Sequence, residues 1–132
     1  MIATADEEQF VELAHSRIWR EPGLIGIRNA PGAEIGLAEA QACLAAVRRL
    51  ARGGRVKLLV DGSGCAGMSR EARRFFAGEQ AAAVIRAQAI VSRGAVGRMI
   101  GNFFLGLNKP PFPTRIFEDE AEARRWLERS EP

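Results

Sequence analysis

The sequence predicts an α/β domain with a mixed, largely parallel sheet of about five strands flanked by helices, in the order ββαβαβαβα. Short apolar runs rich in Val, Ile and Leu alternate with longer segments whose apolar residues recur at helical spacing. After an opening hairpin each strand is followed by a helix, and this alternation requires crossover connections between parallel strands. No linker, repeat or low-complexity segment interrupts the 132 residues, so we expect a single domain over residues 1–132.

The first elements expected are two strands joined by a tight turn. Residues 1–9 are polar and are expected to be loose. Residues 10–16 are compatible with either a strand or a helix, and the pattern leaves both open. Residues 17–21 and 23–29 are predicted strands, with a hairpin turn at positions 22–23.

An amphipathic helix is predicted over residues 37–52. Gly36 is its expected N-cap, Glu39 lies near its positive end, and two glycines follow it. Its apolar face is expected to comprise Leu37, Ala40, Leu44, Val47 and Ala51. The next apolar run, residues 56–61, lies between glycines and is predicted to be a central strand covered on both faces.

The second half continues the alternation. The elements expected there are a loop at 62–68, a helix that begins after Ser69 and bends near Gly78, a strand at 86–92, a helix at 95–108, a short strand at 114–117 and a last helix opened by Asp119 and Glu122. Ala123, Trp126 and Leu127 are expected to face inward from the last helix.

Composition narrows the function classes. The formal charge is +3 and the pI is about 9.5, but the basic residues are scattered rather than gathered in one stripe with stacking aromatics, so nucleic-acid binding is not expected. The apolar runs are too short to span a membrane, and the first residues do not have the pattern of a secretory signal. Two cysteines 22 residues apart fit a reducing compartment, so we expect a cytoplasmic protein.

The segment GSGCAG at 62–67 matches the glycine spacing of a dinucleotide-binding loop, between a predicted strand and a predicted helix. The helix, however, begins after Ser69, beyond the last glycine, and no acidic residue follows about 20 positions later. A plain tight loop is therefore the favoured interpretation. If the loop does bind a small molecule, Gly64→Asp is expected to abolish binding and leave the fold intact.

No catalytic or metal site is predicted. Asp61, Ser63 and Ser69 lie near the same loop, but the single histidine, His15, is distant in sequence, and the spacing of a nucleophile elbow is absent. One histidine and two distant cysteines do not form a metal-ligand set. Cys65 is expected to be an inert thiol, with a reactive one as the alternative. No cofactor is expected.

The predicted helix at 95–108 contains Gly97 and Gly101, each of which costs about 1 kcal/mol relative to alanine in a helix. Close packing on the sheet or a helix–helix contact between two copies would compensate that cost. Both interpretations stay open, and a dimer contact would use Gly97, Met99, Gly101 and Phe104.

Several segments together resemble small bacterial proteins of the SpoIIAA-like (STAS/SEC14-like) family. The matching segments are PGAEI (31–35), LLVD (58–61), SREARRFFAG (69–78) and IGNFFLGLNKPPFPTRIF (100–117), the last followed by an acidic helix. The resemblance spans residues 17–128 and implies an open, mixed sheet flanked by helices. It implies no established activity.

In the wider STAS group, phospho-regulated proteins carry a serine at the start of the helix that follows a strand ending in Asp-x-Ser-Gly. Here Asp61 to Gly64 fits that strand end, but Ser69-Arg70 stands in place of the expected Asp-Ser pair, so that the serine is one position early. The resemblance thus implies Ser69 as a phosphorylation candidate near Arg70 and Arg73, whereas helix capping explains Ser69 equally well.

Two function classes follow from the sequence. The first is a non-enzymatic regulatory or protein-interaction domain, homodimeric or bound to another protein. It would act through the loop at 62–69 and the adjacent helix, or through the helix that contains Gly97 and Gly101. The second is a small-molecule, lipid or nucleotide carrier that uses the same loop together with Lys109 and Arg115.

Overall fold

The structure is a computed structural model that describes residues 9–93 and 110–130. Its elements in chain order are β1 (Phe10–Glu12), β2 (Ser16–Glu21), β3 (Leu24–Asn29), β4 (Ala33–Ile35), α1 (Leu37–Ala51), β5 (Val56–Asp61), β6 (Cys65–Met68), α2 (Arg70–Phe76), α3 (Glu79–Ala82), β7 (Ile85–Val91), β8 (Thr114–Phe117) and α5 (Glu120–Arg129). The predicted helix at 95–108, with Gly97, Met99, Gly101 and Phe104, lies outside the described residues, and so does Lys109.

The main sheet has six strands in the order β1-β2-β3-β5-β7-β8. Its first three strands are antiparallel to one another, and the pairs β3–β5, β5–β7 and β7–β8 are parallel. The predicted mixed, largely parallel α/β architecture is confirmed. The question left open for residues 10–16 is also answered, because Phe10–Glu12 pairs with β2 as an edge strand.

Two short strands form a second sheet that the sequence did not predict. β4 and β6 pair in parallel, with Ile35 opposite Met68. The expectation that residues 62–68 form only a loop is therefore wrong for Cys65–Met68. Each of the two strands has only three or four residues, too few for an alternating pattern to stand out from a loop.

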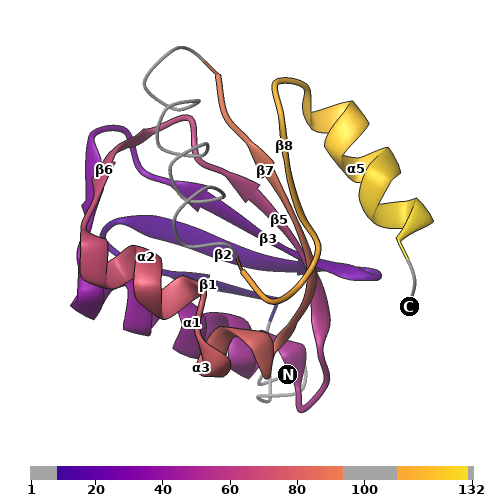
Figure 1. Ribbon diagram of the computed structural model, residues 1–132, viewed down its shortest axis with the longest axis horizontal. Helices are drawn as coiled ribbons and strands as arrows, with labels where there is room; N and C mark the ends of the chain where they lie inside the picture. Colours follow the sequence, from indigo (N-terminus) through magenta and orange to yellow (C-terminus); the bar gives the residue numbers. More distant parts are fainter. Residues whose placement is uncertain (1–8, 94–109, 131–132) are drawn as a thin grey trace, which may run out of the picture.

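Helices cover both faces of the main sheet (Figure 1). α1, α2 and α3 lie on one face, and α5 lies on the other. The strand β5 is central, as predicted: Leu58 packs in the cluster on the α1 side, and its neighbour Leu59 packs with Ala123 and Leu127 of α5. Successive strand residues point to opposite faces, so one apolar run serves both layers.

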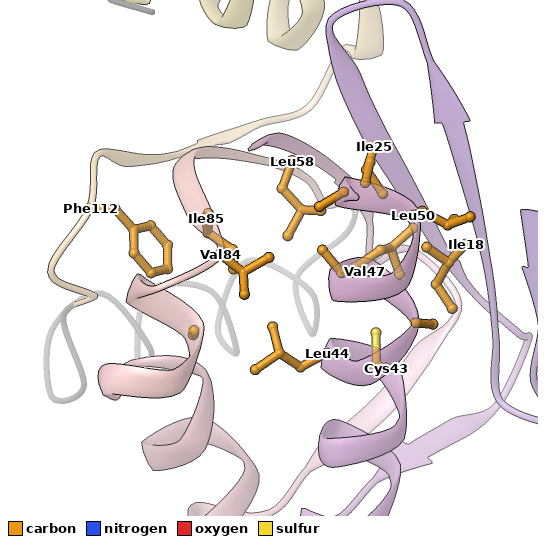
Figure 2. Packing of buried hydrophobic residues seen from close by; sticks show 14 residues of the cluster. Ile18, Ile25, Cys43, Leu44, Val47, Leu50, Leu58, Val84, Ile85 and Phe112 are labelled. Atoms are coloured by element: carbon orange, nitrogen blue, oxygen red, sulfur yellow. The ribbon is translucent and has the colours of Figure 1, made fainter. Parts of the chain in front are cut away.

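The larger core lies between the sheet and α1, and Figure 2 shows its packing. Leu44, Val47 and Leu50 of α1 meet Ile18 and Ile25 of the hairpin strands there, and all five are almost completely buried. The predicted apolar face of α1 is confirmed at Ala40, Leu44, Val47 and Ala51. Leu37, in the first turn, is 41% exposed, so its predicted inward position is wrong.

The ends of three helices match the expected signals. The Gly36 N–H donates to the Glu39 carboxylate over 2.9 Å at the start of α1, and Arg52 ends that helix in the left-handed conformation with φ 55°. α2 ends before Gly78, as the predicted bend requires, and α3 starts at Glu79. Asp119 Oδ1 accepts from the Ala121 N–H over 2.9 Å and caps α5.

A polar cluster joins the opening hairpin to α5. The Trp19 ring lies over Gly26, where a Cβ atom would come within 2.2 Å of the ring. Trp19 Nε1 donates to the Glu21 carboxylate, and Arg124 of α5 donates to both of its oxygens at 2.8 and 3.0 Å. The hydrogen bonds from Arg124, supported by the one from Trp19, lower the pKa of Glu21.

Candidate functional site

A cavity of about 100 Å³ lies on the α1 side of the main sheet, at the carboxyl ends of its parallel strands. Residues two positions apart point to the same face of a strand, so every second residue of β3, β5 and β7 near this end lines the cavity. The lining residues from these strands and their ends are Ile27, Asn29, Leu58, Val60, Gly62, Gln88, Ile90 and Ser92. Ligands of open α/β sheets commonly bind at the carboxyl ends of the strands.

The rest of the lining comes from the elements that pack over the sheet and from the β1–β2 turn. These residues are His15, Ser16, Ile35, Cys43, Cys65, Met68 and Phe76. The second sheet matters here because β4 contributes Ile35 and β6 contributes Cys65 and Met68. Unpredicted pairing of two short strands thus builds one side of the cavity.

The cavity is mainly apolar and holds a few polar side chains. Ser16 Oγ lies 3.0 Å from His15 Nδ1 and accepts a hydrogen bond from Asn29 Nδ2 over 3.0 Å. Gln88 and Ser92 are 8% and 3% exposed, and no hydrogen bond joins their side chains to another described residue. These two polar side chains distinguish the cavity from a purely apolar packing gap.

The described lining of this site carries no charged side chain. None of the described lining residues is Asp, Glu, Lys or Arg. The residues that the structure describes also contain no group of three or more potential metal ligands. An ionised ligand in the cavity would therefore find no counter-charge among these residues, and burying a charge without a partner is costly.

The two cysteines both line the cavity as neutral thiols. Burial raises the pKa of Cys43 to about 12. Burial also raises the pKa of Cys65, and its thiol donates to the Gly67 carbonyl oxygen over 3.3 Å. A thiol with a raised pKa contains little thiolate at neutral pH, which favours the inert interpretation of Cys65.

The glycine-rich segment is held tightly rather than left open for a phosphate. A Cβ atom on Gly64 would come within 2.7 Å of the Asn29 carbonyl oxygen and 2.9 Å of that of Ala30. The Gly64 carbonyl oxygen accepts from Gly32 N–H over 2.9 Å, and Cys65 N–H donates to Gly62. Gly64 thus allows two backbone segments to meet, and this geometry leads us to expect that Gly64→Asp disturbs the fold, contrary to the expectation from the sequence.

Asp61 and Ser63 lie beside the cavity without lining it. Asp61 follows Leu59 by two residues, so its side chain belongs to the α5 side of the sheet, where its carboxylate lies 3.3 Å from Arg28 Nε. The same carboxylate accepts from the Ser63 N–H over 3.0 Å. Of the segment 61–69, Gly62, Cys65 and Met68 line the cavity. The residues proposed from the sequence, Asp61, Ser63, Gly64, Ser69, Arg70 and Arg73, do not.

The residues at the start of α2 have structural contacts. Ser69 Oγ accepts from the Ala72 N–H over 3.1 Å and is the N-cap of the helix. Arg73 donates to the Met68 carbonyl oxygen over 2.6 Å, whereas Arg70 is exposed. These contacts match the capping interpretation of Ser69 and do not bring Arg70 or Arg73 to the cavity. Arg115 is exposed on β8, 5.2 Å from the Phe117 ring, and is likewise not part of the cavity lining.

Sequence reasoning missed the polar residues of the cavity. Gln88 interrupts the apolar run of β7, and Ser92 directly follows this strand at a position of the same parity; this was the available signal. His15 is half-buried, and its contact with Ser16 could not be read from the sequence pattern.

Comparisons with known proteins agree with the fold and assign no activity. The model of a domain of unknown function, DUF7793, matches residues 18–131. No curated protein matches the chain. A crystal structure of an uncharacterised DUF3478-family protein from Shewanella loihica PV-4, described as having a SpoIIAA-like fold, is similar with a TM-score of 0.58. The two chains are 17% identical, and the match covers 89% of this chain and 98% of that one.

The similarity confirms the predicted SpoIIAA-like architecture. Within the described ranges, every helix is too short or too polar to cross a membrane.

Proposed function

We propose that this chain, which belongs to the DUF7793 family of domains of unknown function, is a non-enzymatic module. The geometry of its cavity suits a small, uncharged, mainly apolar ligand. The observation that carries this proposal is the cavity at the carboxyl ends of β3, β5 and β7, with its apolar lining and its few polar side chains. Small-molecule sites generally combine these two features.

The size of the cavity limits the ligand. An apolar cavity of about 150 Å³ in another protein binds benzene. A cavity of about 100 Å³ that is partly open to solvent therefore suits a small ring or a short chain. A nucleotide, which the glycine spacing had suggested, is both too large and too highly charged for this lining.

The polar residues do not form a recognisable catalytic set. His15 contacts Ser16, but Asn29 bonds the serine rather than the imidazole, and no carboxylate among the described residues orients the ring. A nucleophile–base pair needs such an orienting group. This supports binding rather than catalysis as the role of the cavity.

The first experiment is native mass spectrometry of the freshly purified protein, in which a reproducible non-covalent adduct supports the proposal. The second is a titration with toluene followed by 1H–15N correlation spectra. We expect shifts confined to residues around the cavity. An absence of any shift up to the solubility limit of toluene would contradict the proposal.

Val60→Phe is expected to fill the cavity and weaken toluene binding at least about tenfold, since the added ring takes the place of the ligand. Val56→Phe is the matched control, because Val56 lies on the same strand, is also half-buried and does not line the cavity. Equal binding by the two variants would show that toluene binds elsewhere.

Self-association through β1 is a second candidate function. β1 is the edge strand of the main sheet, and among the described residues no strand pairs with its outer side. Phe10 on this strand is 58% exposed, next to Trp19 on the sheet face opposite α1. Two copies that paired β1 in antiparallel fashion would each supply the other's missing strand and cover both Phe10 rings.

This candidate predicts a dimer mass in light scattering and a monomer for Phe10→Asp. Leu37→Asp is the matched control, because Leu37 is also a large exposed apolar residue, 41% exposed, but lies on α1. We expect it to stay dimeric. A monomeric wild-type protein at micromolar concentration would overturn the candidate.

A further inference from the structure

The Gln88 side chain is the most unusual group in the cavity. Its amide carries two N–H donors and one carbonyl acceptor. Gln88 is 8% exposed, and within the described part of the chain its side chain makes no hydrogen bond. Because Gln88 lines a mainly apolar cavity, a ligand group that hydrogen-bonds its amide there would gain binding free energy.

The position of Gln88 sets the orientation of a ligand. Gln88 of β7 lies opposite Leu58 of the neighbouring strand β5. It is four residues before Ser92, which corresponds to about 13 Å along the strand. Ser16, Asn29 and Ser92 therefore lie toward the carboxyl end of the sheet, and Gln88 is the one polar lining residue of the described strands that lies deeper. Between these two polar ends the lining consists of Ile27, Leu58, Val60 and Ile90.

We infer that Gln88 is the specificity-determining residue of the cavity and that it selects ligands with a neutral group that both donates and accepts hydrogen bonds, such as a carboxamide. Two amides can pair through two N–H···O hydrogen bonds, which would satisfy a donor and the acceptor of Gln88 together. The apolar body of the ligand would then lie along Ile27, Val60 and Ile90. This inference rests on the proposed binding function.

The same geometry disfavours ions. The Gln88 amide is uncharged, and Asp61 and Arg28, each adjacent in sequence to lining residues, pair with each other on the opposite face of the sheet. A carboxylate in the cavity would lose its hydration and meet no cation among the described lining residues. Neutral amides should therefore bind where the related anion does not.

The test compares three ligands that share one ring: benzamide, toluene and benzoate, titrated into the wild-type protein at neutral pH. We expect benzamide to bind at least tenfold more tightly than toluene, and benzoate to show no saturable binding. Equal affinities for benzamide and toluene would overturn the role of Gln88 and leave the binding function intact. Tightest binding of benzoate would overturn the neutral ligand class, and binding of none of the three would contradict the binding function itself.

The matching variant is Gln88→Met, which keeps the length of the side chain and removes its hydrogen-bonding groups. We expect benzamide affinity to fall about tenfold to the level of toluene, while toluene affinity stays the same or rises. Toluene binding also reports that the variant is folded. Gln80→Met is the control, because Gln80 is exposed on α3 and should not alter either affinity. An unchanged preference for benzamide in Gln88→Met would overturn the inference.

Discussion

Replacing Gly64 by alanine is expected to destabilise the domain by about 2–3 kcal/mol, because the new methyl group would overlap two backbone carbonyl oxygens. The contacts would be 2.7 Å to Asn29 and 2.9 Å to Ala30, and backbone atoms cannot move aside as a flexible side chain can. The measurement is the free energy of unfolding from urea denaturation followed by circular dichroism.

Gly67→Ala is the internal control for Gly64→Ala, since both glycines belong to the same GSGCAG segment. A Cβ atom on Gly67 would have its nearest neighbour at 3.8 Å, which is an ordinary contact. Its effect on the free energy of unfolding should stay within about 0.5 kcal/mol. If the two substitutions cost the same, close backbone approach is not the reason for the glycine at position 64.

Leu50→Ala is expected to lower the free energy of unfolding by about 2–5 kcal/mol, the usual cost of a large-to-small change in a core. Leu50 is 1% exposed and packs in the cluster between α1 and the main sheet, so the truncation leaves a void that its neighbours fill only in part. Urea denaturation again gives the value.

Leu37→Ala provides the comparison on the same helix with the same chemical change. Leu37 is 41% exposed, and we expect a loss of no more than about 0.5 kcal/mol. A loss as large as that of Leu50→Ala would mean that Leu37 is buried in solution, as the helical periodicity had predicted.

This pair of leucines illustrates how far a periodic pattern reaches. Apolar spacing identified α1 and the side of the helix that faces the sheet, because a helix that packs on a core needs a continuous apolar stripe. The pattern does not show where the sheet that the helix packs on ends. It therefore predicted that Leu37 is buried like the other apolar residues of the stripe.

The candidate site was less predictable than the fold. The sequence suggested Gly64, Ser69 and Arg73 as site residues because their residue types and spacing resemble known motifs. In the structure Gly64 permits a backbone contact, Ser69 caps α2, and Arg73 bonds the Met68 carbonyl. Each has a local structural role, which a short motif cannot distinguish from a functional one.

The sequence by itself determined the order of the elements, the central position of β5 and the limits of most helices, because these depend on apolar periodicity, glycines and capping residues that act within a few positions. The cavity depended on the tertiary structure. Gln88, Asn29 and Cys65 belong to segments far apart in the chain, and they share one cavity only because of the strand order and the pairing of β4 with β6. Strand register and pairing between distant segments are set by packing across the whole domain, and a local pattern does not record them.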